Sequence, residues 1–371
     1  MRKLTAINFI HQFFWAVIVI TLPLYLIEKD INVEEIGLIL SLIPLTMLVL
    51  RTIGAMVSDI IGTKLFFMFQ GIFQMLAAGA YMIATAPIHF AFGKTFEGTS
   101  YSLFWAVDRT AIFGTAKAKG KAAAKMTSVR MAAGAAGLLF GGYVAYTFSF
   151  ELVYQILIGL GLITFILALI RHNIGDHKGE KLSQTLELKN KHRLFWETSI
   201  AMAFAVASNV LFLSFLLPVF MDLSLNADYA IIGFTMAVYF IGTGIGINIA
   251  TRFGLVEKKL LPYQLLAIPL MMLLPFSGGF FIPLMLIVGV ATGIVWGMYE
   301  ELIAEVTKED INISTSIALL HVPVKILEFA ALAASGFLFI IFGGEFLFIL
   351  SALLLLMYIL IADRVLRKIN P

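Results

Sequence analysis

Long apolar segments alternate with short polar connectors along most of the chain. A helix needs about 20 mostly apolar residues to cross a bilayer. On that criterion the pattern predicts twelve membrane-spanning helices. They are expected at residues 5–27, 36–58, 64–86, 88–112, 124–146, 150–170, 195–220, 229–251, 260–276, 279–304, 313–342 and 345–363. Because little sequence remains between them, we expect an integral, multi-pass membrane protein without an extramembrane domain.

Lysine and arginine residues are concentrated at the N-terminus and in every second connector. The densest group is Lys117, Lys119, Lys121 and Lys125, whereas the alternate connectors are mainly acidic. Cytoplasmic loops of membrane proteins are enriched in basic residues. The distribution therefore predicts that both termini are cytoplasmic, and the cell (plasma) membrane is the expected location.

The longest polar stretch, 171–193, lies close to the middle of the chain and predicts a linker between two six-helix halves. We expect an N-terminal bundle at 1–172, a cytosolic linker at 173–193 and a C-terminal bundle at 194–371. Internal matches support a duplication, because several residue pairs recur at equal spacing in the two halves. These are Gly98 and Trp105 with Gly289 and Trp296, and Arg130 and Gly141 with Lys325 and Gly336. The predicted fold class is an all-α membrane protein with two pseudo-symmetric six-helix bundles.

The composition agrees with a lipid environment. Hydrophobic residues make up 60% of the chain and charged residues 13%, with a mean hydropathy of +0.96. Soluble domains are about 45–50% apolar and about 25% charged, so a cytosolic enzyme or a nucleic-acid binder is excluded. The absence of cysteine excludes disulfides and thiolate metal sites. No catalytic motif is present, and we expect neither enzymatic activity nor a cofactor or bound metal.

The connector between the second and third segments carries the most specific motif. It reads Gly54-Ala-Met-Val-Ser-Asp59-Ile-Ile-Gly62-Thr-Lys64, and on these residues the chain resembles the major facilitator superfamily. Ala55 and Ile60 depart from the family pattern, which has glycine and a basic residue there. A glycine allows a tight reversal, and an aspartate can contact a helix N-terminus. Asp59, Gly62 and Lys64 are therefore candidates for a conformational latch, and a loop that only sets topology is the alternative.

Glycines in the fifth and eighth segments predict close helix contacts. Gly137-Leu138-Leu-Phe-Gly141-Gly142 resembles a motif associated with antiporters, although Leu138 replaces its proline. The resemblance implies that these two helices slide at the interface between the halves. The predicted packing residues are Gly137, Gly141, Gly142, Gly242 and Gly246, with static packing as the alternative for each.

Ionisable residues at membrane depth are costly and indicate function by default. Glu97, Tyr101, Trp105 and Asp108 share one face of the fourth segment, and the resemblance implies that this helix lines the central cavity. We predict that Glu97 couples to protons or contacts substrate. A structural pair with Lys94, one turn earlier, is the alternative.

Two further segments carry ionisable groups at depth. Lys325 and Glu328 in the eleventh segment predict either a second charge site or a self-contained ion pair, and Pro323 predicts a kink. His11 in the first segment predicts a proton relay, with a satisfied hydrogen-bond partner as the alternative.

Aromatic and polar residues complete the predicted site. The predicted cavity-lining residues are Gln12, Trp15, Tyr101, Trp105, Asn209 and Trp296. The predicted gate residues, which also suit plain packing, are Arg51, Asp108, Arg109, Arg130 and Glu300. The aromatic residues favour an amphipathic organic solute, and ordinary aromatic packing is the alternative.

These features predict a secondary active transporter that works by alternating access. Glu97 and His11 make protons the expected coupling ion, and we expect export of an amphipathic compound by proton antiport. Proton-coupled uptake of a sugar, organic acid or peptide is the first alternative. A non-transporting lipid-handling or receptor-like protein is the second. The expected partners are a small-molecule substrate, protons and the lipid bilayer, but no nucleic acid, and the resemblance implies a monomer.

Overall fold

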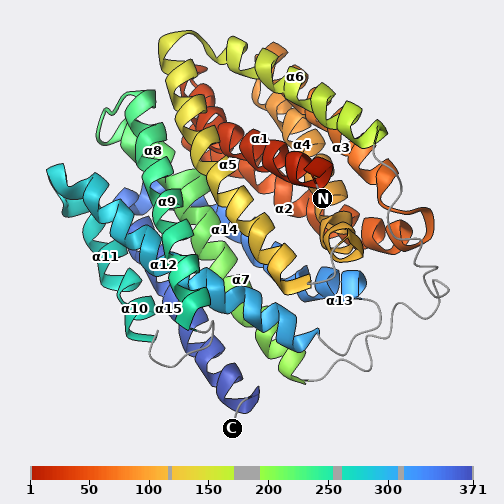
Figure 1. Cartoon of the computed structure of the whole chain (residues 1–371). Coiled ribbons are helices and arrows are strands. Elements are labelled where there is room, and N and C mark those ends of the chain that lie inside the picture. Colours follow the sequence, from red (N-terminus) through yellow and green to blue (C-terminus); the bar gives the residue numbers. More distant parts are fainter. Residues whose placement is uncertain (1, 116–118, 171–192, 254–260, 308–312, 370–371) are drawn as a thin grey trace.

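In the computed structural model, residues 2–115, 119–170, 193–253, 261–307 and 313–369 are described, and every element among them is a helix. The first half of the chain forms six long helices (Figure 1). They are α1 (Arg2–Glu28), α2 (Val33–Ile61), α3 (Lys64–Ile83), α4 (Pro87–Thr115), α5 (Lys119–Thr147) and α6 (Phe150–Leu169). Each contains most of one predicted segment, because a long apolar run satisfies its backbone hydrogen bonds internally only as a helix.

The second half also forms six helical segments, several of which are broken. The first contains α7 (Arg193–Asn209), the π-helix η3 (Val210–Leu216) and α8 (Leu217–Leu223), and α9 (Tyr229–Phe253) follows. The third contains α10 (Leu261–Leu265), α11 (Ala267–Leu273) and the short 3₁₀ turn η5 (Leu274–Phe276). The last three are η6 (Gly278–Phe280) with α12 (Phe281–Val306), α13 (Ile313–Leu320) with α14 (Val322–Phe342), and α15 (Gly344–Ile369). The predicted count of twelve segments is confirmed.

Not every segment is equally apolar. Within the described ranges, nine helical segments are long and apolar enough to cross a membrane, and 261–276 forms a shorter apolar helix. The two remaining long helices, α4 and α5, carry most of the buried charged residues of the first half, among them Glu97, Asp108 and Arg130. These charges account for the weaker membrane signal of the two helices.

Equivalent helices pack together in the two halves. In the first half α1 packs on α5, α2 on α4, and α3 on α6; in the second half the corresponding pairs are α7 with α14, α9 with α12, and α11 with α15. The halves meet along two further pairs, α5 with α9 and α2 with α14. In Figure 1 the first half is coloured red to yellow-green and the second green to blue. The fold is thus two pseudo-symmetric six-helix bundles that share one interface.

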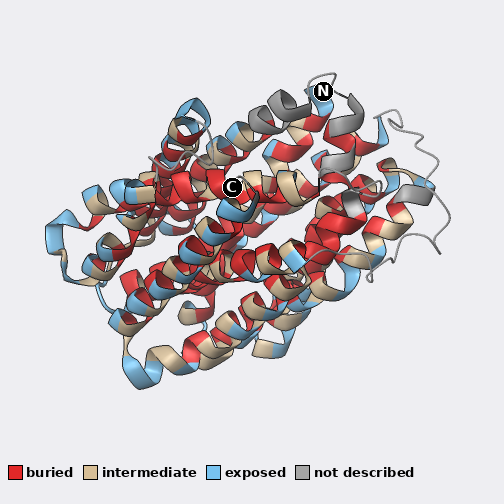
Figure 2. Ribbon diagram, turned by 90° about the horizontal axis from the view of Figure 1, so that it is seen from below, coloured by how far each residue is buried: buried red, intermediate tan, exposed pale blue. Residues whose placement is uncertain are grey.

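The outer faces of the helices are apolar. Figure 2 shows buried residues concentrated along the inner faces of the helices and exposed residues towards the outside. The exposed residues include large apolar side chains such as Phe234 (49% exposed), Ile341 (67%) and Leu360 (55%). Water-soluble monomers rarely expose extended apolar patches. The protein is therefore an integral, multi-pass membrane protein.

Two breaks in the second half lie at mid-helix positions. The kink predicted at Pro323 is present: α13 ends at Leu320 and α14 begins at Val322, with His321 between them. Proline lacks a backbone N–H and cannot continue the hydrogen-bond pattern. The π-helix at Val210–Leu216 was not anticipated from the sequence, and π-helical turns occur frequently at functional sites.

The predicted linker, 173–193, falls almost entirely outside the described residues. The limits 1–172 and 194–371 for the two bundles therefore stay predictions.

Candidate functional site

A cavity of about 280 Å³ lies between the two halves. Three tryptophans of the four in the chain line it, Trp15 from α1, Trp105 from α4 and Trp296 from α12. The other polar or aromatic side chains that line it are His11, Gln12, Arg51, Lys94, Tyr101, Ser214, Tyr299, Glu300, His321, Lys325 and Glu328. The cavity therefore combines charged groups with aromatic surface, and both halves contribute to it.

Most of the predicted site residues meet at this cavity. The predicted residues that line it are His11, Gln12, Trp15, Arg51, Tyr101, Trp105, Trp296, Glu300, Lys325 and Glu328. Tyr299 and His321 also line it, although the sequence analysis did not select them. Helical spacing would have found both, since each lies three or four residues from a selected residue.

Glu97 lies behind the cavity wall. Its side chain is fully buried, and Oε2 accepts hydrogen bonds from the Tyr81 hydroxyl at 2.6 Å and from Lys94 Nζ at 2.9 Å. Oε1 has no hydrogen-bond partner among the described residues. Lys94 lines the cavity and Glu97 does not. Glu97 was predicted to lie on the cavity face; instead the three-residue offset from Lys94 turns it about 60° around the helix, towards Tyr81 of α3.

The second half carries a similar pair in a different setting. Lys325 Nζ lies 2.5 Å from Glu328 Oε2, and both side chains line the cavity. His321, in the break between α13 and α14, has Nε2 3.2 Å from the Tyr299 hydroxyl and Nδ1 2.7 Å from the Ile317 carbonyl oxygen. These contacts fix the broken part of the eleventh segment at the cavity wall.

His11 is held by contacts within the first half. Its Nδ1 lies 3.2 Å from Gln70 Nε2, and its ring stacks on Phe104 with centroids 3.6 Å apart. The side chain is 1% exposed. This environment fits the alternative reading of His11, a hydrogen-bond partner between helices.

Two predicted gate residues form a buried network inside one half. Asp108 accepts a hydrogen bond from Asn8 Nδ2 at 2.8 Å and pairs with Arg130, whose Nε donates to Asn8 Oδ1 at 2.9 Å. The Arg130 guanidinium also lies 4.8 Å from the centroid of the Trp105 ring. Among the described residues this network joins α1, α4 and α5, all in the first half.

The latch motif is described in part. Gly62 ends α2 with φ of +81°, a backbone conformation that other residues rarely adopt, and Lys64 begins α3. The tight reversal is therefore present. The side chains of Asp59 and Arg109 lie outside the described residues.

Asn209 lies at a different site from the one expected. Its Nδ2 is 3.3 Å from the Tyr239 hydroxyl, and it lines a separate, very small cavity within the second half. Trp296 contacts both cavities. Asn209 is therefore one residue layer away from the central cavity.

The predicted packing glycines face different partners. A Cβ at Gly142 would lie 2.4 Å from the Tyr229 carbonyl oxygen of α9, so this glycine permits contact between the halves. Gly137 and Gly141 pack on α1, and Gly242 and Gly246 pack on α12. Of the five, Gly142 alone packs against the opposite half.

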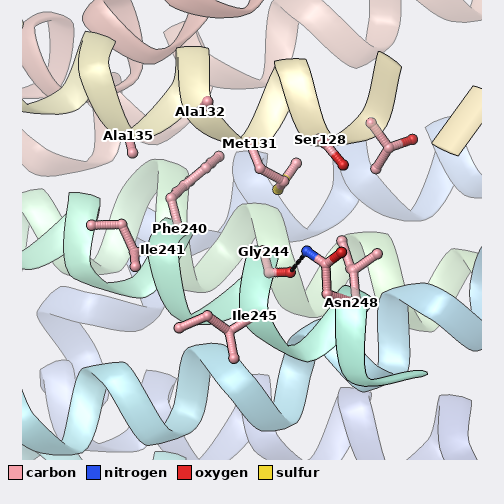
Figure 3. A pocket seen from close by; sticks show the side chains of 11 residues that line it. Ser128, Met131, Ala132, Ala135, Phe240, Ile241, Gly244, Ile245 and Asn248 are labelled. Carbon is pink, nitrogen blue, oxygen red and sulfur yellow. Dashed lines mark hydrogen bonds between the residues drawn. The ribbon is translucent and has the colours of Figure 1, made fainter. Parts of the chain in front are cut away.

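The interface between α5 and α9 is closed at one end and hollowed at the other. Beside the contact between Gly142 and Tyr229 the backbones almost touch. Towards the other end, a groove of about 250 Å³ is lined by Ser128 and Met131 of α5 and by Gly244 and Asn248 of α9 (Figure 3). Among the described residues, α5 and α9 therefore approach each other most closely beside Gly142.

No group of three or more His, Cys, Asp or Glu residues in the described part of the chain could hold a metal ion.

The sequence matches the family model of the Major Facilitator Superfamily over residues 4–320. No curated protein matches the chain. Three solved structures illustrate the likeness of fold. A D-xylose–proton symporter has 12% identity and a TM-score of 0.74, with 95% of this chain and 96% of that chain covered. The E. coli fucose:proton symporter FucP has 13% identity and a TM-score of 0.72, with 98% of each chain covered.

The third is an inward-facing, occupied bacterial homologue of the human lysosomal transporter Spinster, with 14% identity and a TM-score of 0.74. Here 98% of this chain and 96% of that chain are covered. At these identities the three structures show a common fold.

Proposed function

This chain belongs to the major facilitator superfamily, and from that premise we propose that it is a proton-coupled secondary active transporter of a small organic solute. The observation that carries the proposal is the cavity between the halves, which is lined by the Lys325–Glu328 pair, by Lys94 with its partner Glu97 behind the wall, and by three tryptophans. Transporters built from two such halves bind substrate near the midplane and rock about the site.

The contacts between the halves support alternating access. The two halves touch closely beside Gly142 and are separated by a groove near Asn248. If the halves rock about the cavity, the tight and open ends exchange. Asp59, Gly62 and Lys64 are then proposed to act as the latch, and Arg51 and Glu300 as gate residues.

Proton coupling rests on Glu97. A fully buried carboxylate with one unpartnered oxygen is costly in its charged form, and a proton removes that charge. Lys94 connects this carboxylate to the cavity, because it pairs with Glu97 and also lines the solute space.

Two directions of transport remain to be distinguished. Export by proton antiport is the direction favoured by the partial motif at Gly137–Gly142. Proton-coupled uptake is the second candidate, because two of the structures with a similar fold are sugar–proton symporters. We further propose that the protein works as a monomer in the cell (plasma) membrane with both termini cytoplasmic.

The test is solute flux in proteoliposomes under an imposed pH gradient. The panel contains a radiolabelled sugar, an aromatic carboxylate, a dipeptide and an amphipathic amine. Antiport predicts that a solute moves against the proton flow, and symport predicts movement with it. If no solute in the panel moves in response to the gradient while the protein is folded and correctly inserted, the transport proposal fails and the receptor-like alternative gains support.

A further inference from the structure

We propose that the central cavity binds an aromatic carboxylate, with Lys94 as the cation that holds its anionic group; this rests on the proposed transport function. The solute class follows from three features of the cavity: its charge balance, the position of Lys94 and the aromatic lining. Each is taken in turn.

The charges around the cavity balance when no proton is bound at Glu97. Arg51, Lys94 and Lys325 are the arginine and lysine residues that line it, and Glu300 and Glu328 are the acidic ones. Glu97, paired with Lys94 behind the wall, makes three charges of each sign. A net charge inside the membrane carries a large penalty. One proton on Glu97 therefore creates one positive charge in excess, which one solute anion neutralises. Because the proton and the anion then bind together, this inference rests on the symport candidate rather than on antiport.

Lys94 is placed to change partners. Its Nζ donates to Glu97 Oε2 at 2.9 Å, and its side chain also reaches the cavity surface. An ammonium group has three donors and no acceptor. When Glu97 is protonated, Lys94 loses its charged partner, whereas the Tyr81 hydroxyl still contacts Oε2. The solute carboxylate then takes the place of the charged partner that Lys94 has lost.

The proton can bind to Glu97 without displacing a hydrogen-bond partner of the oxygen that accepts it. Its Oε1 has no partner in the described part of the chain. The titratable groups that face Glu97 are Lys94 and Tyr101 on α4, Tyr81 on α3 and Tyr154 on α6. Since the tyrosines are neutral near physiological pH, Lys94 is the charge that responds to the proton.

The pair in the other half suits an anion less well. Lys325 and Glu328 are 2.5 Å apart, and both line the cavity. A solute carboxylate at Lys325 would directly face the Glu328 carboxylate. At Lys94 the competing carboxylate is set back from the surface, so repulsion between like charges is weaker there.

The remaining surface suits an aromatic ring. Trp15, Trp105 and Trp296 line the cavity from both halves, together with Tyr101 and Tyr299. Aromatic pairs prefer stacked or edge-to-face contacts. A volume of about 280 Å³ lies near the lower end of the range of about 300–1,000 Å³ for ligand pockets. One ring system with one acid group is therefore the solute size that we infer.

The experiment compares three probes that share a ring and differ in charge: indole-3-acetate, indole-3-acetamide and tryptamine. Binding to the purified full-length protein in detergent is measured by thermal shift, since a ligand stabilises the folded state by mass action. Indole-3-acetate is expected to bind about tenfold more tightly in mildly acidic than in mildly alkaline buffer, a coupling of ordinary size. The amide and the amine are expected to bind weakly and without that dependence.

Variants assign the effect to residues. Glu97→Gln mimics the protonated carboxyl and should bind indole-3-acetate tightly in both buffers. Lys94→Gln should lose the preference for the acid over the amide, and Lys94→Arg should retain it. Lys29→Gln, at an exposed lysine outside the cavity, is the control and should behave as the unmodified protein does.

Each outcome decides the proposal. Equal binding of the acid and the amide, preference for the amine, or no binding of any probe overturns the anion site. If Lys94→Gln does not fold, the pH dependence of Glu97→Gln still decides, because an unchanged dependence contradicts the proposed exchange. Proton-driven flux of another solute class alone leaves the transport function standing and removes the anion site. Selective binding of indole-3-acetate without flux of any solute leaves the anion site standing and removes the transport function.

Discussion

Each half of the protein places a lysine and a glutamate three residues apart on a helix beside the cavity, yet the two pairs differ in exposure to it. In the first half, Glu97 is fully buried, lies behind Lys94 and receives a second hydrogen bond from Tyr81. In the second half, Lys325 and Glu328 both line the cavity. Identical spacing therefore gives an enclosed carboxylate in one half and a cavity-facing carboxylate in the other. The difference indicates that rotation of each helix about its axis decides which carboxylate lines the cavity.

The largest expected difference between the two pairs concerns stability. Lys94→Met leaves Glu97 buried without its cation, and breaking a buried pair in this way typically costs about 3–5 kcal/mol. Lys325→Met removes the cation from Glu328, which is 6% exposed and lines the cavity, so we expect a smaller loss than in Lys94→Met. The measurement is thermal unfolding of both variants in detergent. Equal losses would mean that the two carboxylates are equally shielded.

The double variant Lys94→Met with Glu97→Leu is the matched control. Replacing a buried ion pair by apolar residues is often neutral or stabilising. Recovery of the unfolding temperature therefore attributes the loss in Lys94→Met to the unpaired carboxylate rather than to poor packing of methionine.

A smaller effect is expected on proton coupling. Glu97→Gln removes the proposed proton site and should reduce the response of solute flux to a pH gradient by about tenfold, within the usual range of coupling free energies. Glu328→Gln should change the affinity for solute more than the response to pH. Flux in proteoliposomes with and without the gradient separates the two. A normal pH response in Glu97→Gln combined with a lost response in Glu328→Gln would reverse the roles proposed for the two halves.

The sequence was sufficient for the fold because the relevant signal is length. Long apolar runs in a bilayer leave helices as the viable structure, and the segments at 5–27 and 229–251 lie within α1 and α9. The kink at Pro323 was predictable for a similarly local reason. The π-helix at Val210–Leu216 was not, since no proline or glycine occurs within it.

The site was predictable only as far as the helix faces could be inferred. Apolar contacts cover both the lipid-facing and the bundle-facing sides of a membrane helix, so hydrophobicity hardly fixes its rotation. Polar residues such as Gln12 and Lys325 identified the cavity side correctly. Glu97 and Asn209 were displaced by one residue layer, and four of the five packing glycines contact helices of their own half. A small rotation of a helix about its axis decides which of its residues line the cavity. That rotation depends on contacts with helices that are distant in the sequence.

The smallest expected effect sharpens the comparison by removing a single hydroxyl. Tyr81→Phe deletes the donor at 2.6 Å from Glu97 Oε2 and keeps the ring that packs against Gly93. The net contribution of such a bond to a charged group is about 1.5–3 kcal/mol, and Lys94 remains to hold the same oxygen, so we expect a loss near the lower limit. The second half offers a matched control, Tyr358→Phe, because the buried Tyr358 hydroxyl has no hydrogen-bond partner among the described residues. That substitution should leave the unfolding temperature unchanged or slightly raise it.

A loss in Tyr81→Phe that disappears in the Glu97→Gln background would show that the hydroxyl stabilises the charged carboxylate, since a double-variant cycle isolates the interaction between two groups. Additive losses would mean that Tyr81 supports the helix packing alone, and the enclosed pair would then consist of Lys94 and Glu97 without a third member.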